Sequence, residues 1–313
     1  MNNNVRLGIC GLGRFGKNRL VPALKKIDNI ELKSFVRGNY LDAVEFKNLN
    51  DLLTTQSCDL IHITSPNAMH YYQSLQCLEA STNVICEKPL SISSLHSKQL
   101  LQKAQEKNCH LFVGHMLRSS PVIKKFKEML YCRTIGSIEQ IRINFFYSID
   151  ANKRKWVWNR EISGGGCVID SGIHCFDLLH YLFEQDIILH NCTLQKNEFN
   201  IETSASIEGA IGETSCIFNL NANAEYESSL FIKGSKTNIK IENFGATWGT
   251  SKILVINPET NKTENTIEID VSSVYEEQYR KIIKLILNNK FDYSMALDAI
   301  RNLILIEDIY SCA

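Results

Sequence analysis

The sequence predicts two parts of different fold class: an α/β domain on a parallel sheet, then an α+β domain with a large, mostly antiparallel open sheet. Short apolar segments alternate with helical ones as far as Arg118, which is typical of β-α-β units. Long runs of alternating polar and apolar residues follow Pro121, which is typical of antiparallel strands with one solvent-facing side. A chain of 313 residues is long enough for two domains, and we place them at residues 1–118 and 119–313.

The first part consists of short strands joined by helices. The expected strands cover residues 5–10, 30–36, 43–46, 59–64, 83–86 and 110–113. The expected helices cover residues 15–27, 50–55, 68–80 and 95–107. This order predicts a parallel sheet with helices on its faces.

The second part is expected to contain a helix at 121–130 and a long strand at 138–149, followed by five further alternating runs between residues 204 and 258. A helix with the sequence GGGCVIDSGIHCFDLLHYLF (164–183) lies between the first two runs, and two helices at 275–288 and 294–310 close the chain. The pattern predicts a sheet that is open on one face.

The composition excludes several classes of partner. Lys plus Arg and Asp plus Glu number 34 each, so nothing in the charge favours nucleic acid or a membrane surface. Eleven cysteines without a C-x-x-C pattern favour buried thiols in a reducing cytoplasm over disulfides or a structural metal site. The first residues lead directly into a glycine motif without a signal-peptide pattern. We expect a cytoplasmic protein without a metal, and its zero net charge favours a homodimer or homotetramer.

A glycine motif follows the first strand and opens the first helix: Gly11-Leu12-Gly13-Arg14-Phe15-Gly16, which is G-x-G-x-x-G. In this context the first glycine permits a tight turn, the second lets a pyrophosphate approach the backbone, and the third lets the helix pack against the strand. The alternative is a plain glycine turn. The position between strand and helix favours a dinucleotide held at the helix N-terminus.

The residue after the second strand bears on the choice between NAD and NADP. A carboxylate there would bind the ribose hydroxyls of NAD, but this chain has Arg37. An arginine can pair with the 2′-phosphate of NADP and stack on adenine. The sequence therefore favours NADP, with NAD and a merely solvated arginine left open.

Several further motifs occur in order along the chain. They are Thr64-Ser65-Pro66-Asn67 with His70, Val84-Ile85-Cys86-Glu87-Lys88-Pro89, Val113-Gly114-His115 leading to Arg118 and Pro121, and Gly164-Gly165-Gly166 with Asp170, His174 and Asp177. Together with the glycine loop, this set resembles the glucose–fructose oxidoreductase / inositol dehydrogenase / rhizopine-catabolism (Gfo/Idh/MocA) family. The resemblance implies a Rossmann domain followed by an open α+β domain that carries the substrate and often the oligomer interface.

Three of these residues are the candidates for catalysis. Lys88 follows a parallel strand at the sheet edge where ligands bind, and Asp170 and His174 share one face of the expected helix with Asp177. Oxidation of a secondary alcohol needs a base, which histidine supplies near neutral pH, and a cation that stabilises alkoxide charge. The resemblance implies Lys88 as hydroxyl polariser and proton relay, Asp170 as a substrate hydrogen-bond partner and His174 as acid/base, with Asp177 structural.

Other residues are implied to bind ligands. The resemblance implies that the cofactor contacts the glycine loop together with Arg37, Ser65, Pro66, Asn67, His70, Glu87, Lys88 and Arg118. Trp156 precedes the triple glycine and is a candidate for stacking on a sugar, although core packing is the commoner role of tryptophan. The remaining histidines outside these motifs are interpreted as structural, namely His62, His96, His110, His180 and His190.

The function expected from these observations is hydride transfer between nicotinamide and a secondary alcohol or ketone of a sugar, cyclitol or nucleotide-linked sugar. Two other functions stay open at this point. One is a glycosidase that oxidises and re-reduces its sugar through bound NAD. The other is a non-catalytic protein that senses sugars or dinucleotides on the same fold.

Overall fold

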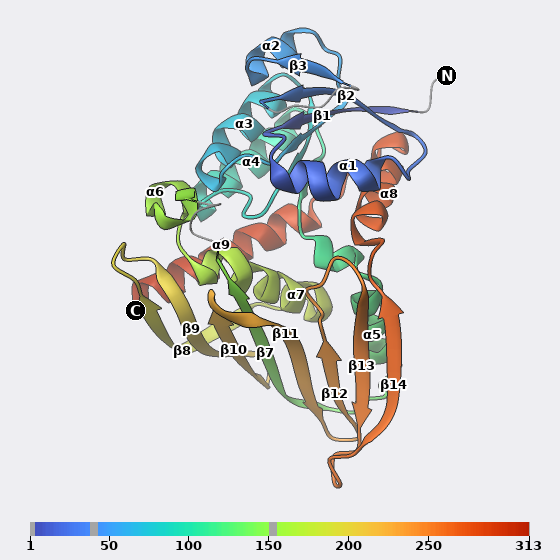
Figure 1. Ribbon diagram of the computed structural model, residues 1–313, viewed down its shortest axis with the longest axis vertical. Helices are drawn as coiled ribbons and strands as arrows, with labels where there is room; N and C mark the ends of the chain where they lie inside the picture. The colour runs from blue at the N-terminus through green and yellow to red at the C-terminus, as the bar shows by residue number, and fades with distance from the viewer. Residues whose placement is uncertain (1–3, 38–42, 150–154, 313) are drawn as a thin grey trace. The chain divides into compact units, whose positions relative to one another are not determined.

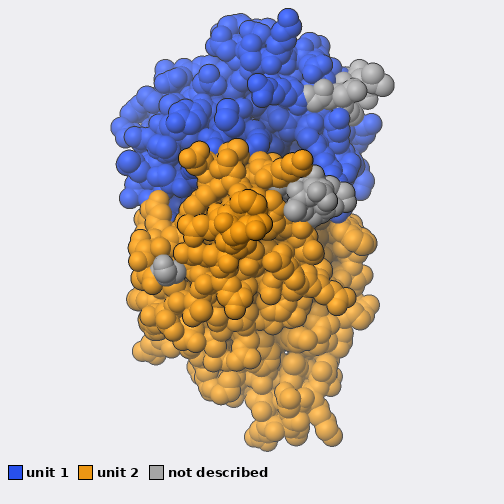
Figure 2. Space-filling model, turned by 60° about the vertical axis from the view of Figure 1, so that its left-hand side comes forward, with its two compact units in different colours: residues 1–115, 275–303 blue, residues 116–274, 304–313 orange. Residues whose placement is uncertain are grey.

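The computed structural model describes residues 4–37, 43–149 and 155–312, and two compact units are formed by these residues. The first unit comprises Met1–His115 and Tyr275–Leu303, and the second comprises Met116–Val274 and Ile304–Ala313 (Figure 2). The chain thus leaves the first unit, builds the second and returns to the first near its end. The sequence-based domain limits at residues 118 and 119 stay a prediction.

A six-stranded parallel sheet forms the centre of the first unit (Figure 1). Its strands are β1 (Val5–Cys10), β2 (Ile30–Val36), β3 (Val44–Phe46), β4 (Leu60–Ile63), β5 (Asn83–Cys86) and β6 (Leu111–Val113). They lie in the order β3-β2-β1-β4-β5-β6, with every pair parallel. The order reverses direction at β1, so the crevice beyond the carboxyl ends of β1 and β4 is where this type of sheet binds ligands.

Helices cover both faces of this sheet. They are the π-helical turn η1 (Gly16–Leu20), α1 (Val21–Leu24), α2 (Leu49–Thr54), α3 (Asn67–Glu79), α4 (Ser94–Glu106), α8 (Val274–Leu287) and the first half of α9 (Ser294–Cys312). Right-handed crossovers place α1 on one face and α2, α3 and α4 on the other. Helix α8 lies beside α1, because Lys26 Nζ is 2.7 Å from Glu276 Oε1 and Arg280 donates to the Lys26 carbonyl. The helix expected at 15–27 therefore begins as a π turn and ends earlier, at Leu24.

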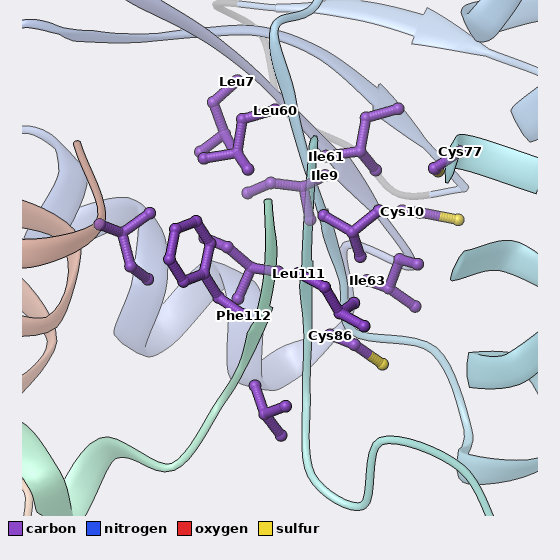
Figure 3. Close-up of a cluster of buried hydrophobic side chains, with 14 of the residues drawn as sticks. Leu7, Ile9, Cys10, Leu60, Ile61, Ile63, Cys77, Cys86, Leu111 and Phe112 are labelled. Carbon is purple, nitrogen blue, oxygen red and sulfur yellow. The ribbon is translucent and has the colours of Figure 1, made fainter. Parts of the chain in front are cut away.

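The core of the first unit packs against both faces of the parallel sheet (Figure 3). Strand β4 is buried along its whole length, and its side chains alternate between the two faces. Ile61 and Ile63 therefore point to one face, while Leu60 and His62 point to the other. All eleven cysteines are free thiols, and Cys10, Cys77 and Cys86 are packed in this core as small apolar residues.

The second unit is built on an eight-stranded sheet in the order β14-β13-β12-β11-β7-β10-β9-β8 (Figure 1). Only β7 and β10 pair in parallel among its described strands. The strands are β7 (Ile138–Ser148), β8 (Ile187–Lys196), β9 (Glu202–Ile211), β10 (Thr214–Asn221), β11 (Asn223–Gly234), β12 (Asn238–Glu242), β13 (Thr250–Ile256) and β14 (Thr263–Asp270). The mostly antiparallel sheet confirms the predicted fold class, but β8 and β14 were not predicted.

Helices cover one face of the antiparallel sheet. The helical segments of this unit are η2 (Met116–Ser119), α5 (Pro121–Tyr131), η3 (Lys155–Trp158), α6 (Arg160–Ser163), the π-helical turn η4 (Val168–Gly172), α7 (Ile173–Phe183) and the end of α9. Of these, α5, η4 and α7 pack against the strands. The helix expected over 164–183 thus starts at Val168, and its first turn is π-helical. None of the helices in the described ranges has the length and apolar character needed to cross a bilayer.

Candidate active site

The glycine loop of the first unit joins β1 to η1. Gly11 has φ +88° and its N–H donates to the Val36 carbonyl, and a Cβ there would lie 2.8 Å from the Ser65 nitrogen. At Gly16 a Cβ would lie 2.8 Å from Leu12 Cδ1. The turn thus needs glycine at 11 for its backbone conformation, and the helix packs close to the loop because residue 16 has no side chain.

The loop has room for the dinucleotide that the motif implies. A Cβ built on Gly13 would meet only the Gly11 carbonyl oxygen, at 3.8 Å, and both Gly13 and Arg14 are exposed. The N–H groups in the first turn of the helix have no intrahelical acceptor and carry the positive end of the helix dipole. The open loop and these amides fit a pyrophosphate.

Arg37 follows β2 at the same edge of the sheet. It is exposed and has φ +54°. Burial raises the pKa of the Cys10 thiol to about 12, and the positive charge of Arg37 partly offsets that effect. The guanidinium charge therefore acts close to the end of β1, beside the glycine loop.

His70 ties together the loops that follow β4 and β5. Its Nδ1 lies 2.6 Å from the Pro89 carbonyl oxygen and its Nε2 lies 2.8 Å from the Ser65 carbonyl oxygen. Burial lowers the pKa of this imidazole, although the two carbonyl contacts act in the opposite direction. Ser65 Oγ also donates to Gln73 Oε1 at 2.6 Å. His70 therefore holds the shape of both loops, and a direct contact with cofactor stays a prediction.

Glu87 and Lys88 stand directly after β5, at the carboxyl edge of the parallel sheet. Lys88 is half-buried, and the Lys88–Pro89 peptide bond is cis. Glu87 Oε1 lies 3.2 Å from His62 Nε2. The structure therefore gives His62, for which the sequence predicts a structural role, a contact with a predicted cofactor-binding residue. No local pattern around His62 indicated this contact.

The triple glycine of the second unit is packed against the chain itself. A Cβ on Gly165 would overlap the Tyr310 hydroxyl, and one on Gly166 would overlap the Glu202 carbonyl oxygen. The Glu202 side chain is fully buried, and its Oε1 accepts from Gly166 N–H and from the Tyr310 hydroxyl, both at 2.6 Å. The sequence suggested that these glycines leave room for a ligand. At Gly165 and Gly166 that room is filled by Glu202 and Tyr310.

Asp170 and His174 lie on consecutive turns after this loop, in η4 and α7. Both are half-buried. The Tyr147 hydroxyl, from β7, donates to Asp170 Oδ2 at 2.9 Å. The His174 ring lies nearly parallel to that of Phe145, with centroids 6.2 Å apart. Because Phe145 and Tyr147 are two residues apart on one strand, they share a face of the sheet. This face places an aromatic wall beside both candidate residues, and Tyr147 was not predicted.

Asp177 is buried in an ion pair. Arg118 donates from Nε and Nη2 to the two carboxylate oxygens of Asp177, at 2.9 and 2.5 Å. The Arg118 guanidinium carbon also lies 5.3 Å from the centroid of the Tyr181 ring. This bidentate ion pair joins η2 to α7, as expected of a structural aspartate. A cofactor contact from Arg118 stays a prediction.

Trp156 lies in η3, shortly before the glycine-rich loop, and is half-buried. Its contact with substrate stays a prediction. Within the first unit, the glycine loop, Ser65–Asn67 and Glu87–Lys88 share one edge of the sheet. Within the second unit, Asp170, His174 and Tyr147 come together, while Asp177 and Arg118 form a separate buried pair.

Two family models match the chain in succession. One, described as "Oxidoreductase family, NAD-binding Rossmann fold", matches residues 5–115, and the other, "GFO/IDH/MocA C-terminal domain", matches residues 123–240. The chain belongs to the Gfo/Idh/MocA family. As a member of the Gfo/Idh/MocA family it is an NAD(P)-binding oxidoreductase. The predicted family, fold class, enzyme class and cofactor are thereby confirmed.

Relatives within the Gfo/Idh/MocA family are distant in sequence. "Oxidoreductase P35" of Formosa agariphila is 25% identical over 80% of this chain and 84% of its own length. "Glucose-6-phosphate 3-dehydrogenase" of Bacillus subtilis is 26% identical over 63% of this chain and 59% of its own length. A crystal structure of a 3-ketoreductase mutant from Actinomadura kijaniata, in complex with TDP-benzene and NADP, has a TM-score of 0.91 at 15% identity, covering 99% of this chain and 98% of that one. At this identity the likeness shows the fold.

Proposed function

We propose that this enzyme transfers hydride between the nicotinamide of NADP or NAD and a secondary alcohol or ketone of a sugar, cyclitol or nucleotide-linked sugar. The observation that carries the proposal is the half-exposed pair Asp170 and His174 on consecutive turns, with the Asp170 carboxylate held by Tyr147. A fixed carboxylate beside an imidazole suits a substrate that presents several hydroxyl groups. Both the Bacillus relative and the Actinomadura neighbour carry names that refer to position 3 of their substrates, so we place the reacting carbon at a ring position.

The chemistry is divided among three residues. When bound, the nicotinamide supplies the redox step by accepting or donating a hydride at C4. In the oxidative direction His174 takes the proton of the reacting hydroxyl, and in the reductive direction it returns that proton. The Lys88 ammonium donates a hydrogen bond to the same oxygen and stabilises its negative charge. Asp170 accepts a hydrogen bond from a neighbouring substrate hydroxyl and so orients the ring.

Two further residues support this division of labour. Tyr147 donates a hydrogen bond to Oδ2 of Asp170 and so fixes the orientation of this carboxylate toward the substrate. Trp156, directly upstream of the glycine-rich loop, is proposed to pack against the C–H face of a sugar. Replacement of Trp156 by leucine is then expected to raise the KM for the sugar and to leave cofactor affinity unchanged.

We propose a preference for NADP that depends on Arg37. The guanidinium stands beside the glycine loop, where it can pair with a 2′-phosphate. Arg37→Ser is expected to weaken NADPH binding about 10-fold, equivalent to the loss of one charge-assisted contact, and to leave NADH binding within about twofold. Lys33→Ser removes the same charge from β2 and serves as the control. Equal weakening of both cofactors would contradict the preference.

The test of the proposed function is a substrate panel. The full chain is incubated with sugars, cyclitols and nucleotide-linked sugars, each with NAD and with NADP, and the absorbance of reduced nicotinamide is followed. We expect net reduction or oxidation of the cofactor with at least one compound that has a ring hydroxyl or ketone. Release of a cleaved sugar with no net change in the cofactor would instead support the redox-cycling glycosidase.

We further propose a homodimer or homotetramer that works in the cytoplasm. The uncovered face of the antiparallel sheet carries half-buried Phe146, Ile217 and Phe231 beside a hydrogen-bonded pair, Asn144 and Asn219. Mixed faces of this kind are suited to a protein interface. Light scattering coupled to size exclusion checks this expectation, and a monomer at micromolar concentration would contradict it.

A further inference from the structure

Three polar side chains that are far apart in the sequence meet inside the first unit. The Tyr279 hydroxyl, from α8, lies 2.6 Å from His62 Nδ1, and His62 Nε2 lies 3.2 Å from Glu87 Oε1. Tyr279 and His62 are each 1% exposed, and the Glu87 side chain is 16% exposed. The rings of His62 and Tyr279 also meet edge to face, with centroids 5.8 Å apart. The set forms a hydrogen-bonded chain from the buried Tyr279 of α8 to the carboxyl edge of the sheet.

The direction of donation along this chain follows from its two ends. Burial, with the nearby negative charge of Glu87, raises the pKa of Tyr279 well above its usual value, so the phenol keeps its proton. A carboxylate can only accept. The Tyr279 O–H therefore donates to Nδ1 of His62, whose ring proton lies on Nε2 and is donated to Glu87. The Tyr279 hydroxyl and the His62 ring N–H thus each donate to one acceptor, and the Glu87 carboxylate is the last acceptor of the chain.

Glu87 is confined from a second side by Gly114. A Cβ on Gly114 would lie 2.8 Å from the carboxyl carbon and from both carboxylate oxygens of Glu87. The backbone is fixed as well, because Glu87 N–H donates to the Ile63 carbonyl and Gly114 N–H donates to the Cys86 carbonyl. The carboxylate thus fills the space that glycine leaves, and its place depends on both neighbours.

We propose that His62 and Tyr279 are positioning residues, which hold Glu87 as an acceptor for a ribose hydroxyl of the bound dinucleotide. Glu87 stands directly after β5, beside Lys88, at the edge where open parallel sheets bind ligands. Carboxylates are the acceptors that such sheets offer to ribose hydroxyls. This inference rests on the proposed function, and it extends the cofactor site to a helix more than 150 residues further along the chain.

The experiment measures NADPH and NADH dissociation constants for the full chain by nicotinamide fluorescence. Glu87→Gln is expected to weaken binding about 10-fold and Tyr279→Phe about fivefold, as for the loss of a charged and a neutral hydrogen bond. Because Tyr279 acts through Glu87, the double variant is expected to bind no more than about twofold less tightly than Glu87→Gln alone. If Tyr279 had a purely structural role, the increase in the dissociation constant of the double variant would be the product of the increases in the two single variants.

Two further variants keep the test decisive. Gly114→Ala touches neither His62 nor Tyr279 but displaces the Glu87 carboxylate, so it is expected to weaken cofactor binding about as much as Tyr279→Phe. Tyr293→Phe removes a hydroxyl of the same unit that donates to the Cys109 carbonyl, and it is expected to leave binding unchanged. If Tyr279→Phe does not fold, Gly114→Ala still tests whether cofactor binding depends on the position of the Glu87 carboxylate, and unchanged binding would overturn the proposal.

The outcomes separate this inference from the function on which it rests. If the unaltered protein binds the nucleotide normally, unchanged binding by either Tyr279→Phe or Gly114→Ala would overturn the positioning role alone. Multiplied effects in the double variant would overturn it too. Absence of binding of either nucleotide by the unaltered protein would overturn the proposed function, and the positioning role with it.

Discussion

Tyr147 offers the sharpest test of how the second unit handles its substrate. The substitution Tyr147→Phe removes one hydroxyl and keeps the ring that packs edge to face with Phe145, whose centroid lies 6.3 Å away. The substitution breaks the 2.9 Å hydrogen bond to Asp170 Oδ2. The perturbation therefore acts on the orientation and charge of one carboxylate, with little change in packing.

The size of the effect follows from the kind of bond. A hydrogen bond to a charged group contributes about 1.5–3 kcal/mol when it is well buried. Asp170 and Tyr147 are only half-buried, so water can replace part of the lost interaction and we expect about 1 kcal/mol. This corresponds to a decrease of about fivefold in kcat/KM for the sugar substrate.

The assay compares steady-state rates with saturating cofactor across a range of sugar concentrations. Tyr226→Phe is the matched control, because its ring also meets Phe145 edge to face, at 6.5 Å, while its hydroxyl pairs with Ser228. We expect this control, and the cofactor dissociation constants of both variants, to stay within about twofold of the unaltered enzyme. Equal losses in the two variants, or weaker cofactor binding by Tyr147→Phe, would refute the assignment of Tyr147 to Asp170.

Three further predictions concern the framework of the site. Gly166→Ala places a methyl group on the carbonyl oxygen of Glu202. We therefore expect the free energy of unfolding to fall by about 3 kcal/mol or more, which calorimetry detects as a lower unfolding temperature. Asp177→Ala removes the carboxylate that pairs with the buried Arg118 charge. The free energy of unfolding, measured in urea, is expected to fall by about 3–5 kcal/mol. A decrease below about 1 kcal/mol would contradict a buried ion pair. Burial lowers the pKa of His70 below its usual 6.5, so its contribution to stability is complete above pH 6.5 and decreases as the pH falls toward the folded-state value. Thermal unfolding from pH 7.5 to 5 should be less pH-dependent in His70→Gln than in the unaltered protein, and equal slopes would argue against this assignment.

The parts of the fold that bury apolar residues were predictable from local pattern. Strands β1 and β5 were placed at their observed limits because continuous apolar runs end at a glycine turn or at a charged motif. Strands β8 and β14 were missed, and they are the two edge strands of the antiparallel sheet. Their residues are mostly exposed, so neither carries the apolar alternation by which a half-buried strand is recognised.

The candidate site was predictable where a motif carries its own chemistry. The glycine loop and the residues Lys88, Asp170 and His174 became candidates in this way, and their roles stay predictions. Tyr147, His62 and Tyr279 were missed because their partners lie far along the chain, as with the sequence separation of 217 between His62 and Tyr279. Only folding brings such pairs together, and a single sequence has no signal for them.

The central claim is that Lys88 and His174 act on one substrate oxygen, and a double-mutant cycle tests it most directly. Lys88→Met and His174→Gln are compared with the double variant in single-turnover measurements of nicotinamide oxidation or reduction. Each single variant is expected to lower the rate about 100-fold or more, and the double variant should be about as slow as the slower single one, because groups that work on the same atom are not additive. A double variant whose loss is the product of the two single losses would contradict the claim.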